Sequence, residues 1–259
     1  MQQMAGLNRF TLLLLLYLGI VSSSIAQTHY AGISAAQPTG SAGIATDGLV
    51  AAYDFETYTQ DGLLRDFSSR GNHGKVTQTV KTDGQFGKAR VFAGMTDVVD
   101  LPEDMGLDLS GPLTIATWIK FAKPNLHQHI LSCDDIYVLW TTERDQFRFA
   151  DTRANGFTTQ PGTVKAESWH SVVAVLNATR GDALSPNNIK IYVDGTKLDG
   201  THQPAWEPKS LRPNGCLIGA SVATENNHPA GPVEGVIDEL AVFSRALSEQ
   251  EIQAFSNKP

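Results

Sequence analysis

Residues 113–121 have the sequence LTIATWIKF, and this run decides the fold class. It is mostly β-branched and aromatic, and its alternation indicates an extended strand with one dry face and one wet face. Similar short runs recur along the chain, separated by clusters of Gly, Asn, Asp and Pro: LVAAYDF (49–55), ARVF (89–92), TDVVDL (96–101), DIYVLWTT (135–142), QFRFAD (146–151), SWHSVVAVLN (168–177), NIKIYVDG (188–195), CLIGAS (216–221) and GVIDELAVF (235–243). Ten such runs, without a long helical period, predict an all-β, two-sheet antiparallel sandwich.

Two local signals refine this prediction. Asp194-Gly195 lies between strand-like flanks and forms the preferred pair for a two-residue hairpin turn. Ser248 and Glu251 have the spacing of a capping box, in which each side chain accepts a hydrogen bond from the other residue's backbone amide. A short C-terminal helix is therefore expected after Ser248.

The composition is that of an ordinary globular protein and excludes several classes. The chain has 259 residues, of which 41% are hydrophobic and 18% charged. Lys and Arg total 20 against 27 Asp and Glu, which gives a formal net charge of −7. No basic stripe is available to neutralise a phosphate backbone, so nucleic acid is not an expected partner. The 23 Gly and 12 Pro residues are too few for a disordered or collagen-like chain.

The N-terminal segment, residues 1–26, has the pattern of a signal peptide. Arg9 precedes an apolar run over residues 12–21, which is too short for the roughly 20 residues that cross a bilayer. Ser24 and Ala26 then occupy the −3 and −1 positions of a cleavage site. We expect a secreted protein, located outside the cell, on its surface or in a periplasm; the alternative is an uncleaved membrane anchor.

The rest of the chain divides into a leader and one domain. Residues 27–46 are small and polar without periodicity, which predicts a flexible leader. Residues 47–259 carry all the strand-like runs and form the predicted folded domain. No later segment approaches membrane-spanning length, so no membrane insertion is expected after signal cleavage.

The two cysteines, Cys133 and Cys216, both lie at the ends of strand-like runs. In an oxidising compartment such a pair favours a disulfide, provided that the two strands are neighbours. Two buried free thiols are the alternative.

Seven motifs in order carry a family resemblance: GLVAAYDFE (48–56), DFSSRGNHG (66–74), GQFGKARVFAG (84–94), LTIATWI (113–119), SWHSVV (168–173), IKIYVDG (189–195) and GVIDELAVFSRALS (235–248). Together they resemble the laminin G-like, concanavalin A-like jelly-roll domain over roughly residues 47–256. The resemblance implies two packed sheets, one of them concave, export, frequent glycan or protein binding, and often one structural calcium between the first and last strands. Function itself depends on the site rather than on the fold.

The carboxylates of the outer motifs are candidate metal ligands. Strict alternation places Asp238 on one face with Val236, Leu240 and Val242, where a carboxylate is costly unless it is hydrogen-bonded or bound to a cation. We expect one calcium held by Asp54 and Asp238, with loop carbonyls or the Asn72 amide completing the shell. The alternative is that both carboxylates accept amide hydrogen bonds from nearby turns and hold no ion.

Catalytic signatures are not apparent in the sequence. The paired acids of laminarinase-like hydrolases are missing around Glu239, and residues 128–130 read Gln-His-Ile rather than the Gln-Ile-His of jelly-roll lyases. His127 and His129 form at most a weak metal pair. The expected function is therefore a non-catalytic module that binds a polysaccharide or glycan.

The candidate ligand contacts are Trp140, Arg148 and Trp206, because sugar recognition uses aromatic platforms with a few polar groups. For Trp140 a core position is an equally good interpretation, whereas Trp206 lies in a Pro-rich loop. Two alternatives stay open: an adhesion or scaffold domain that binds cell-surface proteins through loops at the sandwich edge, and a divergent polysaccharide hydrolase or lyase.

Overall fold

The computed structural model describes residues 45–108, 110–133, 137–151, 155–203, 205, 215–225 and 228–258. These residues belong to one compact unit, Gln37–Pro259. The predicted signal peptide, nearly all of the predicted leader and Trp206 lie outside the described residues. In the described part of the chain, no helix is long and apolar enough to span a membrane.

Eighteen strands and one helix follow each other along the chain: β1 (Leu49–Tyr53), β2 (Lys75–Thr77), β3 (Val80–Asp83), β4 (Lys88–Phe92), β5 (Val98–Leu101), β6 (Leu113–Phe121), β7 (His129–Cys133), β8 (Tyr137–Thr141), β9 (Phe147–Ala150), β10 (Gly156–Thr159), β11 (His170–Leu176), β12 (Ile189–Val193), β13 (Thr196–Lys197), β14 (Gly200–His202), β15 (Cys216–Ile218), β16 (Ser221–Glu225), β17 (His228–Ala230), β18 (Gly235–Phe243) and α1 (Glu249–Ser256), as counted over the described residues.

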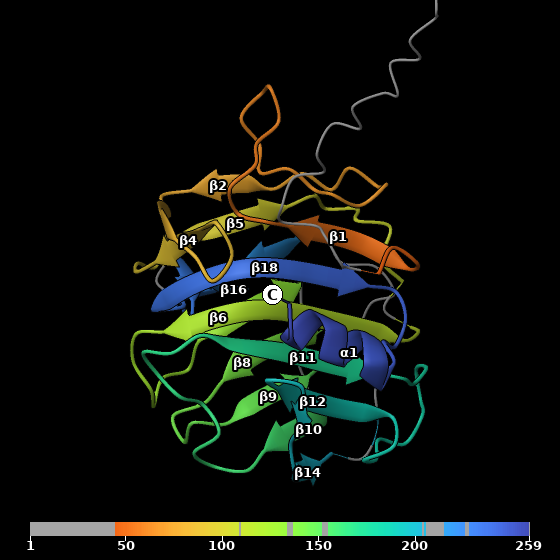
Figure 1. Ribbon diagram of the computed structural model, residues 1–259. Helices are drawn as coiled ribbons and strands as arrows, with labels where there is room; N and C mark the ends of the chain where they lie inside the picture. The colour runs from red at the N-terminus through yellow and green to blue at the C-terminus, as the bar shows by residue number, and fades with distance from the viewer. Residues whose placement is uncertain are drawn as a thin grey trace, which may run out of the picture. The chain divides into compact units, whose positions relative to one another are not determined.

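The strands form two large antiparallel sheets (Figure 1). The first has the order β13-β12-β11-β6-β18-β4-β3, and β1 also pairs with β18. The second has the order β14-β10-β9-β8-β7-β15-β5-β2, and β16 pairs with β17 in a separate hairpin. The predicted two-sheet antiparallel sandwich with a short C-terminal helix is confirmed.

The main core lies between the two sheets, and β6 shows how the sequence builds it. Ile115 and Ile119 join this core, whereas Ala116 and Trp118 point to the opposite face and join a second hydrophobic cluster. The expectation of a wet outer face is wrong for this strand, because all of its residues except Lys120 are buried. The outer face of the first sheet is itself covered.

Helix α1 provides much of that cover. Its N-terminus has the predicted capping box between Ser248 and Glu251. Ile252 and Phe255 are buried in the second cluster, and Figure 1 shows the helix lying over β11. Packing of this amphipathic face is what stabilises so short a helix.

The disulfide between Cys133 and Cys216 is confirmed. The two residues pair directly across β7 and β15 in the second sheet, and both side chains are buried in the main core. Because the bond joins positions separated by 83 residues, it strongly reduces the conformational entropy of the unfolded chain and so stabilises the folded state.

Candidate functional site

A β-bulge in β18 determines where its carboxylates point. Asp238 pairs with Trp118 and Ala241 pairs with Ala116 across β6, so one extra residue lies between these pairs on β18. Glu239 in the bulge has a positive φ of 50°. Ile237 joins the main core together with Leu240 and Val242. The predicted shared face of Asp238, Val236, Leu240 and Val242 is therefore wrong, because a bulge reverses the alternation of side chains.

The bulge buries two neighbouring carboxylates. Asp238 is 0% exposed and Glu239 is 1% exposed. The Phe86 amide donates to Asp238 Oδ2 at 2.9 Å, and Lys258 Nζ lies 2.9 Å from Glu239 Oε1. Burial raises the pKa of Asp238 to about 7 and that of Glu239 to about 8, although the Lys258 ammonium acts in the opposite direction on both.

Asp54 holds the turn that follows β1. Its Oδ1 accepts the backbone amides of Glu56 and Thr57 at 3.0 and 2.8 Å, and its Oδ2 accepts the Thr57 hydroxyl. The carboxylate is buried. Both of its oxygens are thus used by local donors, as in the alternative expected for a carboxylate without an ion.

Asn72 lies next to β1 and belongs to a hydrogen-bond network separate from that of Asp54. Its side-chain nitrogen donates to the carbonyls of Val50 and Met105 at 2.8 and 3.1 Å. Among the described residues no hydrogen bond joins Asn72 to Asp54 or Asp238, and no group of three His, Cys, Asp or Glu side chains is placed to hold a metal. The calcium site remains a prediction, and this donor set does not fit it well.

Trp140 and Arg148 lie side by side on the outer face of the second sheet, as part of a stacked column. His129, Trp140 and Arg148 are paired neighbours on β7, β8 and β9. The His129 and Trp140 rings are 5.8 Å apart and nearly parallel, and the Arg148 guanidinium lies 5.2 Å from the indole centroid. His127 stacks on His129 at 4.8 Å. We call these four residues the stacked column.

The column limits what Trp140 can bind. Because β7 and β9 flank β8, His129 and Arg148 cover opposite faces of the indole. Trp140 is only 8% exposed as a result. Burial, followed by the neighbouring His127, lowers the pKa of His129 to about 3, so this imidazole is neutral at physiological pH. The indole therefore presents an edge rather than an open face to a ligand.

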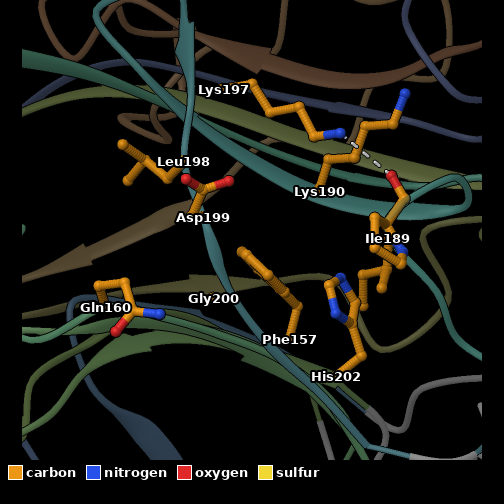
Figure 2. A pocket seen from close by; sticks show the side chains of 10 residues that line it. Phe157, Gln160, Ile189, Lys190, Lys197, Leu198, Asp199, Gly200 and His202 are labelled. Carbon is orange, nitrogen blue, oxygen red and sulfur yellow. Dashed lines mark hydrogen bonds between the residues drawn. The ribbon is translucent and has the colours of Figure 1, made fainter.

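A cavity of about 280 Å³ opens at the edge of the sandwich, between β10 and β14 of one sheet and β12 and β13 of the other. Figure 2 shows side chains from all four strands around it. Its walls are formed by ten residues: Phe157, Gln160, Pro186, Ile189, Lys190, Lys197, Leu198, Asp199, Gly200 and His202. We call this cavity the edge pocket.

Residues 198–200 carry the chain from one sheet to the other and form one wall of the edge pocket. The Leu198 amide donates to the Ile191 carbonyl on β12, and the Gln160 amide beyond β10 donates to the Asp199 carbonyl. The Asp199 side chain is exposed at this crossing. The crossing segment therefore fixes a carboxylate beside the opening.

Phe157 and His202 form the aromatic part of the pocket. They pair across β10 and β14, and their ring centroids are 4.6 Å apart. His202 Nε2 is buried and has no hydrogen-bond partner among the described residues, and burial lowers the pKa of this imidazole. Sequence analysis missed the pocket because β14 is a short edge strand without strand-like composition. The unusual Phe–His pair becomes visible only once the register is known.

Comparison with known proteins identifies the family. The model of the concanavalin A-like lectin/glucanases superfamily matches residues 93–253. The chain belongs to this superfamily. No curated protein sequence matches it significantly.

This superfamily domain is similar to several solved structures. Domain 4 of AbnA, an extracellular GH43 arabinanase from Geobacillus stearothermophilus solved with arabinotriose, is 18% identical with a TM-score of 0.56, over 82% of this chain and 100% of that chain. Trypanosoma rangeli sialidase is 16% identical with a TM-score of 0.58, over 82% and 33%. The receptor-binding domain of botulinum neurotoxin C/D mosaic serotype is 11% identical with a TM-score of 0.57, over 82% and 51%.

These similarities support the fold of the superfamily domain and no more, because all three identities are low. The domain spans the whole arabinanase domain, but only about a third of the sialidase chain and half of the toxin chain.

Proposed function

We propose that this domain is an exported, non-catalytic module that binds carbohydrate in the edge pocket. The observation that carries the proposal is the composition of the pocket wall: the His202 ring, packed on the buried Phe157, lies beside amide, carboxylate and ammonium groups. Sugars present both apolar C–H patches and hydroxyls, so a site of this kind matches both parts of the ligand.

The size of the edge pocket favours a short ligand. Its volume of about 280 Å³ lies just below the range of roughly 300–1,000 Å³ that is typical of drug-sized ligands. The opening suits one or two sugar rings, such as the end of a glycan, rather than a long stretch of polysaccharide.

The pocket chemistry supports binding rather than cleavage. Glycoside hydrolysis generally needs two carboxyl groups about 5–9.5 Å apart across the scissile bond. Asp199 is the one carboxylate among the ten described residues that line the pocket. A divergent hydrolase is therefore the weaker candidate.

Export is supported by the disulfide as well as by the N-terminal pattern. Disulfides persist in oxidising compartments and are rare in the cytosol, and Cys133 pairs with Cys216 in the core. Domain 4 of AbnA is described as part of an extracellular enzyme, which agrees with this location.

A glycan array probed with the secreted protein tests the proposal. We expect a restricted set of glycans to bind, and calorimetry with one of them to show about tenfold weaker binding for Asp199→Asn and for His202→Ala. Lys165→Ala, at an exposed position away from the pocket, is the matched control and should bind normally.

Two results would contradict carbohydrate binding at this pocket. Binding that is unaffected by both pocket variants would place the site elsewhere on the domain. Absence of glycan binding, together with saturable binding to a cell-surface protein, would favour the adhesion alternative. Release of reducing sugar from a polysaccharide would instead favour the enzyme.

A further inference from the structure

Asp238 and Glu239 in the β18 bulge are buried, so their ionised forms need a nearby positive charge. Two of the expected calcium ligands, Asp54 and Asn72, are engaged with other partners. Asp54 uses both carboxylate oxygens on the donors of its own turn, and Asn72 donates to two backbone carbonyls. Asp238 Oδ1 is buried without a hydrogen-bond partner in the described part of the chain. An uncompensated buried charge of this kind is strongly destabilising.

Lys258 brings an ammonium group to this position. Its Nζ lies 2.9 Å from Glu239 Oε1, and its side chain is only 10% exposed. The same ammonium lies 4.6 Å from the centroid of the Phe86 ring, within the range of a cation–π contact. The Phe86 amide in turn donates to Asp238, so the lysine contacts Glu239 directly and is linked to Asp238 through Phe86.

We propose that the Lys258 ammonium serves as a built-in cation for the Asp238–Glu239 bulge, in place of a structural metal ion. The lysine follows α1, so the contact also ties the segment after the helix to β18 and to the Phe86 loop between β3 and β4. A covalently attached cation cannot be removed by chelation. The folded domain is therefore independent of calcium.

A calcium titration of the unaltered protein tests this independence. We expect the melting temperature to be the same, within experimental error, in EDTA, in magnesium and in calcium at equal ionic strength. Native mass spectrometry should show no stoichiometric calcium. A saturable rise in melting temperature with calcium but not with magnesium, or one calcium per chain, would overturn the proposal.

Removal of the ammonium provides the second test. Lys258→Met keeps the length of the side chain. At a pH above the pKa values of both carboxyls it should lower the melting temperature in EDTA by about 5–10 °C, because it leaves buried, ionised carboxylates without a cation. Lys165→Met, an exposed lysine, is the control and should be close to the unaltered protein. A Lys258→Met protein as stable as this control would refute the proposal. If Lys258→Met does not fold, the calcium titration still decides, since it requires no variant.

Discussion

Asp238 and Trp118 are direct partners across β18 and β6, and each carries a buried polar atom without a hydrogen-bond partner among the described residues: Oδ1 of the carboxylate and Nε1 of the indole. The Phe86 ring contacts the indole edge-on, with centroids 5.3 Å apart, while the Phe86 amide donates to Asp238. This arrangement makes the protonation of Asp238 a determinant of stability.

Substitution of Asp238 by Asn should remove part of the pH dependence of folding. Burial raises the pKa of Asp238 to about 7, so the folded state holds a proton that the unfolded state has lost above its ordinary pKa. The stabilisation is therefore complete at low pH and is lost as the pH rises toward 7 and beyond. We expect the stability difference between the unaltered protein and Asp238→Asn to change by about 2 kcal/mol between pH 5 and pH 7, in urea unfolding. Parallel curves for the two proteins would show that Asp238 titrates normally.

His129 in the stacked column should give folding stability the opposite pH dependence to that of Asp238. The pKa of His129 is lowered to about 3, so the imidazole contributes stability that is present above the ordinary histidine pKa and is lost as the pH falls. His129→Gln should reduce this acid sensitivity, with a difference of about 2 kcal/mol between pH 7 and pH 5. NMR titration of the His129 ring gives a direct check, and a pKa near 6.5 would contradict the burial argument. Exposed His127 serves as the internal comparison.

The disulfide should contribute measurably to stability. Replacement of both Cys133 and Cys216 by Ser should lower the free energy of unfolding by about 2–5 kcal/mol. Urea unfolding of the unaltered protein with and without a reducing agent should show a shift in the same direction. A reductant that leaves the midpoint unchanged, while mass spectrometry confirms two free thiols, would rule out this contribution.

The capping box of α1 can be tested by one substitution. Ser248→Ala removes the side chain that accepts from the Glu251 amide and should destabilise the domain by about 1 kcal/mol. Ser256, at the other end of the helix, is not a suitable control because it accepts a hydrogen bond from Ser171. Ser248→Gly is the better control and should destabilise the domain less than Ser248→Ala. Equal losses for Ala and Gly would indicate that the cap is not formed.

Sequence patterns were sufficient for the fold because its central strands are long and strongly apolar. Residues 113–121 and 235–243 both form strands at the predicted positions, and Asp194-Gly195 forms the expected turn, with positive φ at both residues. Short edge strands such as β2, β3 and β14 were missed, since they are polar and depend on pairing rather than on propensity.

The site was less accessible to sequence analysis for two physical reasons. The extra residue around Glu239 reverses alternation without leaving any compositional signal, so Asp238 was assigned to the wrong face. The partner of Glu239, Lys258, lies beyond a helix, and nothing in its local sequence marks it as buried. Trp140 and Arg148 were each expected as ligand contacts, but their stacking on one another depends on the register of β8 and β9, which the sequence does not show.

The pairing of β1 with β18 places Leu49 opposite Phe243, so the first and last strands of the sandwich run along one another. Domains with adjacent ends tolerate insertion into a host loop and rearrangement of their chain order. A circular permutant that links these ends and opens the Asp194-Gly195 hairpin would keep every strand of the sandwich, so the domain is suited to insertion into other protein scaffolds.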